Sequence, residues 1–418
     1  MRYYDPMFYI SSEEMPFSIR VEIRMKDPID PEALAGAVRE TMKRYSYFSV
    51  QVEREGEDLV LAPNARPVVV YGGEEILPLG SEAVNRHLVA VNYRGSEMNL
   101  MISHIITDGG GFYPFMKTLL YYYITKAYGK AIDAKGIYLA EDPMYPDETG
   151  NPFPEEDMKG AEPLWQNRNQ PFFRLRDGGY VKDTKKTIYR LRINEAQAMQ
   201  FNFDNDGSPC AMVSALLARA IWAVHPEETR DLVSAVSFNL RPGLRAGRNH
   251  HMLSNALQLH YPNRLRDVNV TRLCTCTRGM ITLQSQPENV LYYAEQQRKR
   301  VQEALERLPD AQSRREWFGR AALEDSVNNT FNVSYVGKFG NPDIESRMET
   351  MYAVTDGATW QSVFLEISAI SGWFDISFLQ GFSSDVYYRA FLEQLEMHGL
   401  GYITDETGPM NSPKLILP

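Results

Sequence analysis

One histidine in the chain is followed by residues that could give it a chemical role. His104 ends an apolar run, Asp108 comes four positions later, and Gly109, Gly110 and Gly111 follow directly. An imidazole has an ordinary pKa of about 6.5, so at neutral pH it can accept a proton. A nearby carboxylate can hold the local turn, and glycines let a ligand approach the backbone closely. The spacing predicts a proton-transferring imidazole at the mouth of a cleft.

Each of these residues also has an ordinary structural explanation. His104 could be a satisfied core histidine, and Asp108 could serve only as a helix cap. The glycines could form a plain turn, because no Lys-Ser/Thr pair follows them to make a phosphate loop. The chemical interpretation is favoured by position, because the motif closes an expected hairpin over residues 87–104, with its turn at 94–97.

The surrounding patterns predict mixed α and β structure in both halves of the chain. In the first half, we expect a strand at 18–25 and then a helix that Asp30 caps and that has Pro31 at its first position. Short strands at 48–52, 58–62 and 67–71 have the spacing of a meander, and Gly129 ends a helix that follows the glycines. In the second half, we expect strands at 186–193, 232–240, 331–339 and 365–382, helices that begin at Asn194 and Ser208, helices at 289–308 and 385–398, and a terminal tail. The acidic, proline-rich stretch 130–183 predicts a long surface connection.

Composition excludes several classes of protein. The chain has 418 residues, 44% of them hydrophobic, and a formal net charge of −10, which disfavours binding to nucleic acid phosphates. No apolar run is long enough to predict a membrane span. Cys210, Cys274 and Cys276 are few and odd in number, so we expect no disulfide framework and a reducing, cytoplasmic location. The Cys274–Cys276 spacing does not suit zinc, and no metal site is expected.

The run HIITDGG, residues 104–110, resembles the HxxxDG signature of the chloramphenicol-acetyltransferase-like superfamily. That superfamily includes alcohol acyltransferases, such as alcohol acetyltransferases, as well as plant BAHD acyltransferases, wax-ester synthases and the condensation domains of peptide synthetases. Ser103 stands where many members carry a second histidine. Later segments follow the superfamily's order: Asn239, Arg241 and Asn255 match a condensation-domain element, SYVGKFG (334–340) resembles Tyr-Leu-Gly-Gln-Phe, and QGFSSDVYYRAFLEQL (380–395) resembles the closing strand and helix. Neither the HQDYPFE-like latch nor the DFGWG motif is found.

The resemblance implies an α/β fold of two similar lobes with mixed sheets, residues 1–165 and 166–418, and an active site in a tunnel between them. It implies an acyltransferase that acts on groups other than aminoacyl groups. Such an enzyme would move an acyl group from acyl-CoA, a cosubstrate rather than a bound cofactor, to the hydroxyl or amine of a small-molecule acceptor. The alternatives are a condensation-like enzyme with a donor bound to an acyl carrier protein, and a non-catalytic relative that only binds a ligand.

The resemblance also assigns roles to particular residues. His104 would be the general base, and Asp108 would support the turn through an arginine of the second lobe, with Arg241 the first choice. Ser334 would donate a hydrogen bond to the oxyanion, with Asn255 as its rival. Arg241 as a solvated surface charge and Ser334 as a plain strand hydroxyl remain open alternatives. The residues expected to bind substrate are Gly109, Gly110, Asn255 and Arg241.

Overall fold

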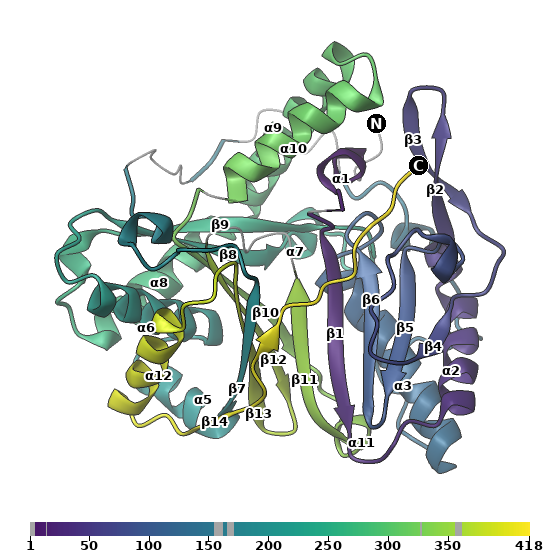
Figure 1. Ribbon diagram of the computed structural model, residues 1–418, viewed down its shortest axis with the longest axis horizontal. Coiled ribbons are helices and arrows are strands. Elements are labelled where there is room, and N and C mark those ends of the chain that lie inside the picture. Colours follow the sequence, from purple (N-terminus) through teal and green to yellow (C-terminus); the bar gives the residue numbers. More distant parts are fainter. Residues whose placement is uncertain (1–4, 14, 154–161, 165–170, 327, 356–361) are drawn as a thin grey trace.

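Two mixed β-sheets lie side by side and form two lobes, with helices packed on their outer faces (Figure 1). This computed structural model describes residues 5–13, 15–153, 162–164, 171–326, 328–355 and 362–418. The first sheet has the order β11 (Met348–Thr355), β1 (Ser18–Met25), β6 (Glu97–Ser103), β5 (Val89–Arg94) and β4 (Val70–Gly72). The predicted α/β fold with two mixed-sheet lobes is confirmed.

The second sheet has the order β14 (Tyr402–Thr404), β7 (Thr187–Asn194), β13 (Trp373–Gln380), β12 (Val363–Ile370), β10 (Phe331–Lys338), β8 (Leu232–Asn239) and β9 (Ser254–Tyr261), and β15 (Gly408–Pro409) also pairs with β7. The neighbours β8, β10 and β12 run parallel, whereas the remaining pairs are antiparallel. Residues of β12 are buried along its whole length, as expected of a central strand covered on both faces.

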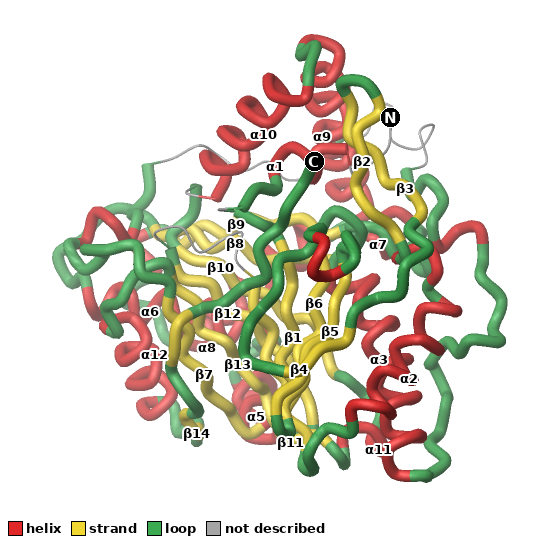
Figure 2. The backbone as a smooth tube through the Cα atoms, turned by 45° about the vertical axis from the view of Figure 1, so that its right-hand side comes forward, coloured by secondary structure: helices red, strands yellow, loops and turns green. Residues whose placement is uncertain are grey.

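Two helices cover the first sheet, and their ends follow from local sequence. Helix α2 (Pro31–Arg44) begins where the Asp30 carboxylate accepts hydrogen bonds from two first-turn amides. Helix α3 (Gly109–Tyr128) begins directly after the turn that carries His104, and it ends at Gly129, whose φ of 60° is left-handed. Helix α3 packs against α2 over the sheet (Figure 2).

The helices of the second lobe are α5 (Glu195–Asp204), α6 (Pro209–Val224), α8 (Val270–Gln284) and α12 (Val386–Met397), with the short helix α7 (Arg241–Leu244) between β8 and β9. The short helix α11 (Pro342–Glu345) packs against α3 and β11 of the first lobe. Helix α6 is apolar nearly all round and lies in the core of this lobe, capped by the Ser208 hydroxyl. Among the described helices, none is by itself long and apolar enough to cross a bilayer. The pair α5 and α6, bent by 82°, passes that test only when taken together.

Above both sheets stand α1 (Asp5–Ile10), α9 (Pro287–Arg307), α10 (Ala311–Ser326) and the hairpin of β2 (Val50–Glu55) and β3 (Asp58–Pro63) (Figures 1 and 2). Helices α1 and α10 pack together, with the rings of Tyr9 and Phe318 stacked at 5.8 Å. Helices α1, α7, α8, α10 and α11 and strands β11, β14 and β15 are not among the elements expected from the sequence.

Two expectations about connectivity are wrong. Residues 50–72 do not form a meander, because β2 and β3 pair with each other whereas β4 runs parallel to β5. The C-terminal segment is not a loose tail either. It returns to the first lobe, where Leu415 bridges to Leu79 and is 2% exposed. In this C-terminal segment the apolar residues stand at irregular intervals between Gly, Pro and polar residues, so no periodic pattern predicted that it packs on the first lobe.

The connection after α3 is more deeply packed than its acidic, proline-rich composition predicts. Glu148 is 1% exposed, and its carboxylate receives two hydrogen bonds from Arg44 of α2, at 2.5 and 2.8 Å. Tyr47 donates a further bond to the same carboxylate at 3.3 Å. The lobe boundary predicted at residues 165 and 166 lies outside the described residues.

The Arg44–Glu148 pair gives a stability prediction. Because Arg44 is fully buried, Glu148→Gln leaves an uncompensated guanidinium in the core, which costs about 3–5 kcal/mol. We expect the urea unfolding midpoint to fall accordingly. Glu82→Gln is the matched control, because Glu82 pairs with Arg66 at the surface, and its midpoint should not change. An equal effect of the two substitutions would contradict a structural role for Glu148.

Candidate active site

Strand pairing fixes the backbone of His104 at the end of β6. Ser103 lies opposite Ser18 in β1, and the His104 amide donates to the Phe17 carbonyl at 2.9 Å. The ring is held by one hydrogen bond, from Nδ1 to the Thr107 carbonyl at 3.1 Å. A carbonyl can only accept, so Nδ1 carries the proton and Nε2 of the neutral ring keeps its lone pair. The turn itself therefore selects the tautomer.

The surroundings of His104 also keep the ring neutral. Burial disfavours the charged imidazolium and lowers the pKa of His104 below its ordinary 6.5. The Asp108 carboxylate and the bond to Thr107 act in the opposite direction but do not outweigh burial. The unprotonated form therefore predominates at neutral pH.

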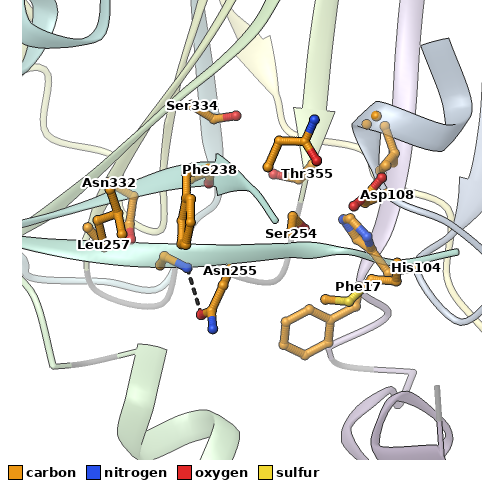
Figure 3. A pocket seen from close by; sticks show the side chains of 18 of the residues that line it. Phe17, His104, Asp108, Phe238, Ser254, Asn255, Leu257, Asn332, Ser334 and Thr355 are labelled. Carbon is orange, nitrogen blue, oxygen red and sulfur yellow. Dashed lines mark hydrogen bonds between the residues drawn. The ribbon is translucent and has the colours of Figure 1, made fainter. Parts of the chain in front are cut away.

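His104 lines a cavity of about 950 Å³ between the two lobes. Residues of β1 form one part of its wall, and residues of β8, β9, β10 and β12 form another, while α1, α9 and α10 close it above. Figure 3 shows His104 and Asp108 together on one side, next to Phe17. The volume is in the range of cavities that hold small molecules. The histidine is thus not enclosed in a dry core.

Asp108 joins three elements at this point. It caps α3, and its Oδ1 accepts from the Gly111 amide at 3.0 Å. Its Oδ2 accepts from the Leu253 amide just before β9 at 2.6 Å. Both oxygens also accept from Arg241, at 2.8 and 3.0 Å. The cap that remained open as an alternative is present, and so is the predicted pair with Arg241.

Every N–H group of the Arg241 guanidinium donates a hydrogen bond to another group of the protein. Besides Asp108, its guanidinium donates to the backbone carbonyls of Asn249 and His251, both at 2.6 Å, and to the Asn239 side chain at 3.1 Å. Its exposed fraction is 5%, so it is not a solvated surface charge. A guanidinium has five N–H groups, and none is left for a ligand. Although Arg241 lines the cavity, this geometry suits bracing rather than the predicted binding of substrate.

The glycines are required mainly by contacts inside the protein. A Cβ on Gly110 would overlap the Arg241 guanidinium, and one on Gly111 would overlap the His250 carbonyl. A Cβ on Gly109 would meet only Val336, at an ordinary 3.5 Å. Gly109 and Gly110 do line the cavity. Contacts within the protein therefore require glycine at 110 and 111, and the predicted contact of Gly109 and Gly110 with substrate stays a prediction.

The two candidate oxyanion donors also line the cavity but are differently placed. Figure 3 shows Ser334 on the far side of the pocket from His104. Ser334 lies opposite Glu366 in the sheet register, and its hydroxyl acts to lower the pKa of that carboxyl. Asn255 lies on β9, where its Oδ1 accepts from the Ala256 amide at 2.7 Å. The structure does not bring Ser334 next to the imidazole.

Sequence reasoning missed Glu366, which lies on β12 and faces the same cavity. The available signal was one carboxylate within an otherwise apolar and small-residue strand, VFLEISAI. A charged residue in a strand buried on both faces demands an explanation. In the described part of the chain, no group of three or more His, Cys, Asp or Glu side chains could hold a metal ion.

Comparison with solved structures identifies the fold, although no protein-family model and no curated protein matches this sequence. The first condensation domain of the CDA synthetase aligns with a TM-score of 0.62 at 14% identity, over 96% of each chain. Polyketide synthase associated protein 5 from Mycobacterium tuberculosis aligns with 0.61 at 13% identity, over 94% of this chain and 96% of that one. TRI101 from F. sporotrichioides, solved with coenzyme A and T-2, aligns with 0.58 at 12% identity, over 95% and 98%.

These alignments extend over nearly the full length of every chain, so the similarity covers both lobes and their arrangement. The expected two-lobed chloramphenicol-acetyltransferase-like fold is confirmed. This fold is shared by condensation domains and by a protein that was solved with coenzyme A.

The glycine geometry predicts opposite effects for neighbouring substitutions. Gly110→Ala forces the Arg241 guanidinium away from Asp108, and overpacking of this kind costs about 1–3 kcal/mol. Gly109→Ala meets no close atom and removes a flexible residue from a helix, so its unfolding free energy should stay within about 1 kcal/mol of the parent or rise. Thermal and urea unfolding of both variants provide the measurement. If Gly109→Ala proves the more damaging, the glycines serve another purpose.

Proposed function

We propose that the chain is an acyltransferase that transfers an acyl group from a coenzyme A thioester to the hydroxyl or amine of a small molecule. The observation that carries this proposal is the state of His104. Its Nδ1 proton is committed to the Thr107 carbonyl, its Nε2 is the proton acceptor, and the ring lines a cavity between the lobes. This is what a general base for a bound nucleophile requires.

In the proposed reaction, Nε2 of His104 takes the proton from the acceptor hydroxyl or amine as that group attacks the thioester carbonyl. The carbonyl carbon becomes tetrahedral, and its oxygen takes up the negative charge. Collapse of this intermediate breaks the carbon–sulfur bond, and the imidazolium returns the proton to the leaving thiolate. The products are an ester or amide and free coenzyme A. One group therefore serves both as base and as acid.

The negative oxygen needs hydrogen-bond donors near His104. The first amides of a helix have no acceptor within it, and the N-terminus carries partial positive charge. In this protein that terminus is the start of α3, where Gly109 and Gly110 line the cavity. Their amides are better placed for the role than Ser334, which lies on the far side of the pocket from His104. We assign the predicted substrate contact of these two glycines to their backbone N–H groups.

The proposed donor, acyl-CoA, has two alternatives: a thioester on a carrier protein, and no donor at all. A carrier-protein thioester would place the same kind of carbonyl next to His104. A ligand-binding relative of the same fold would transfer no acyl group. Release of free thiol from acetyl-CoA or longer acyl-CoAs, tested with panels of alcohols and amines, separates these functions. If thiol is released only from a loaded carrier protein, the chain is a condensation-like enzyme. If a ligand binds but neither donor releases thiol, the chain is a ligand-binding protein.

Loss of the imidazole gives the first test of mechanism. We expect His104→Ala to lower the rate of acyl transfer by about 10²–10⁴-fold, the usual contribution of general-base catalysis. Its melting temperature should change little, because the ring makes one hydrogen bond at the cavity surface. His398→Ala is the matched control, since His398 follows α12 and does not line the cavity, and it should keep the parent rate. Full activity of His104→Ala would exclude the mechanism.

The pH profile gives a second test. Only neutral His104 can accept a proton, and its pKa lies below 6.5, so kcat/KM with an uncharged alcohol should be level above pH 6.5 and fall only at lower pH. The acid limb should disappear in His104→Ala along with most of the rate. A midpoint above 6.5 would show that the base is a different group, or that the ring is exposed to solvent.

A further inference from the structure

The cavity contains a second ionisable group that the proposed reaction does not use. Glu366 lies near the middle of β12, between Ser334 of β10 and Ser377 of β13 in the sheet register. It lines the same cavity as His104 and is 4% exposed. Its Oε1 accepts a hydrogen bond from the Thr355 hydroxyl at 3.0 Å, and the Ser334 hydroxyl also contacts the carboxyl.

The other buried carboxylates of the described residues have an arginine or several backbone amides as partners, whereas Glu366 has neither. Asp108, Glu148, Glu295 and Asp375 each pair with an arginine, and Glu345 accepts from three backbone amides. Glu366 has two neutral hydroxyl partners and, among the described residues, no ion pair. A buried carboxylate without a cation is costly, and burial raises the pKa of Glu366 to about 7. Its charge compensation is incomplete without a ligand.

Among the residues that the structure describes, the two arginines that line the cavity form no ion pair with Glu366. The Arg241 guanidinium has all of its N–H groups engaged elsewhere. Arg300 lies on α9, where it stacks over the Trp317 ring. The cavity lining also includes the ring of Phe238, an aromatic group of the kind that attracts cations. The part of the cavity at Glu366 therefore favours a positively charged group and disfavours the phosphates of coenzyme A.

The sheet register relates this carboxyl to the base. Thr355, which donates to Glu366, lies opposite Ile19 of β1, and Ile19 lies opposite Ile102 of β6, two residues before His104. Two strand spacings are about 10 Å. Figure 3 shows Thr355 between Ser334 and the side of the pocket that carries His104. A ligand several bonds long could reach both groups at once.

We propose that the acceptor carries, besides the nucleophile that His104 deprotonates, a protonated amine several atoms away that binds Glu366. This inference rests on the proposed function, because only an acyltransferase has an acceptor. The binding of the cation itself does not depend on turnover. The charge on Glu366 would make the chain select alkylammonium compounds over neutral molecules of the same shape.

Binding of 6-amino-1-hexanol and 1,6-hexanediol, measured by calorimetry without acyl-CoA, tests this proposal. The two probes have the same length and differ in one terminal ammonium. We expect the amino alcohol to bind at least tenfold more tightly to the parent protein. Glu366→Gln, which keeps the shape of the side chain, should abolish that preference and leave the affinity for the diol within about twofold.

Glu349→Gln is the matched control, because Glu349 is an exposed carboxylate on β11 outside the cavity, and it should keep the preference. Equal affinity of the parent for both probes, or a preference that survives Glu366→Gln, overturns the proposal. If Glu366→Gln does not fold, the parent alone decides: affinity should fall from amino alcohol to diol to 6-hydroxyhexanoate, and a flat or reversed order refutes it.

The same probes separate this proposal from the proposed function. His104→Ala should retain the preference for the amino alcohol while losing acyl transfer. A preference without transfer in the parent removes the enzymatic function but leaves the cation site. Transfer to alcohols without any preference removes the cation site but leaves the acyltransferase.

Discussion

The ion pair between Asp108 and Arg241 is the contact on which the site depends. Its two side chains come from different lobes and are almost completely buried, which is costly unless every hydrogen-bonding position is used. That condition is met, because Asp108 accepts from Arg241 and two backbone amides and Arg241 donates through all of its N–H groups. The turn that carries His104 is therefore tied to both lobes.

Electrostatics divide the cavity into two regions. Around His104, Asp108 is neutralised by Arg241, and the start of α3 offers amides to a developing negative charge. Around Glu366, the hydroxyls of Thr355 and Ser334 adjoin a carboxyl that has no cation among the described residues. A substrate that places a carbonyl oxygen in the first region and an ammonium in the second would satisfy both. The arrangement thus favours binding in a single orientation.

Local signals in the sequence predicted much of the architecture. Caps at Asp30, Asn194 and Ser208 and the stop at Gly129 placed helices correctly. The hairpin that leads to His104 was predicted from two apolar arms joined by a turn at 94–97. The Asp108–Arg241 contact followed from resemblance, because no local pattern joins residues so far apart. The roles of Gly110 and Gly111, the burial of Glu148 and the docking of the C-terminal segment depend on tertiary packing. Glu366 could have been found as a lone charge in a buried strand.

A double-mutant cycle tests most directly whether the Asp108–Arg241 pair holds the turn that carries His104. The unfolding free energy and kcat/KM would be measured for Asp108→Ala, Arg241→Ala and the double variant. If the residues act as one unit, each single substitution costs about 3–5 kcal/mol, and the double variant is no worse than the poorer single one in either quantity. Losses that simply add would mean that the two residues act independently, and that something else orients His104.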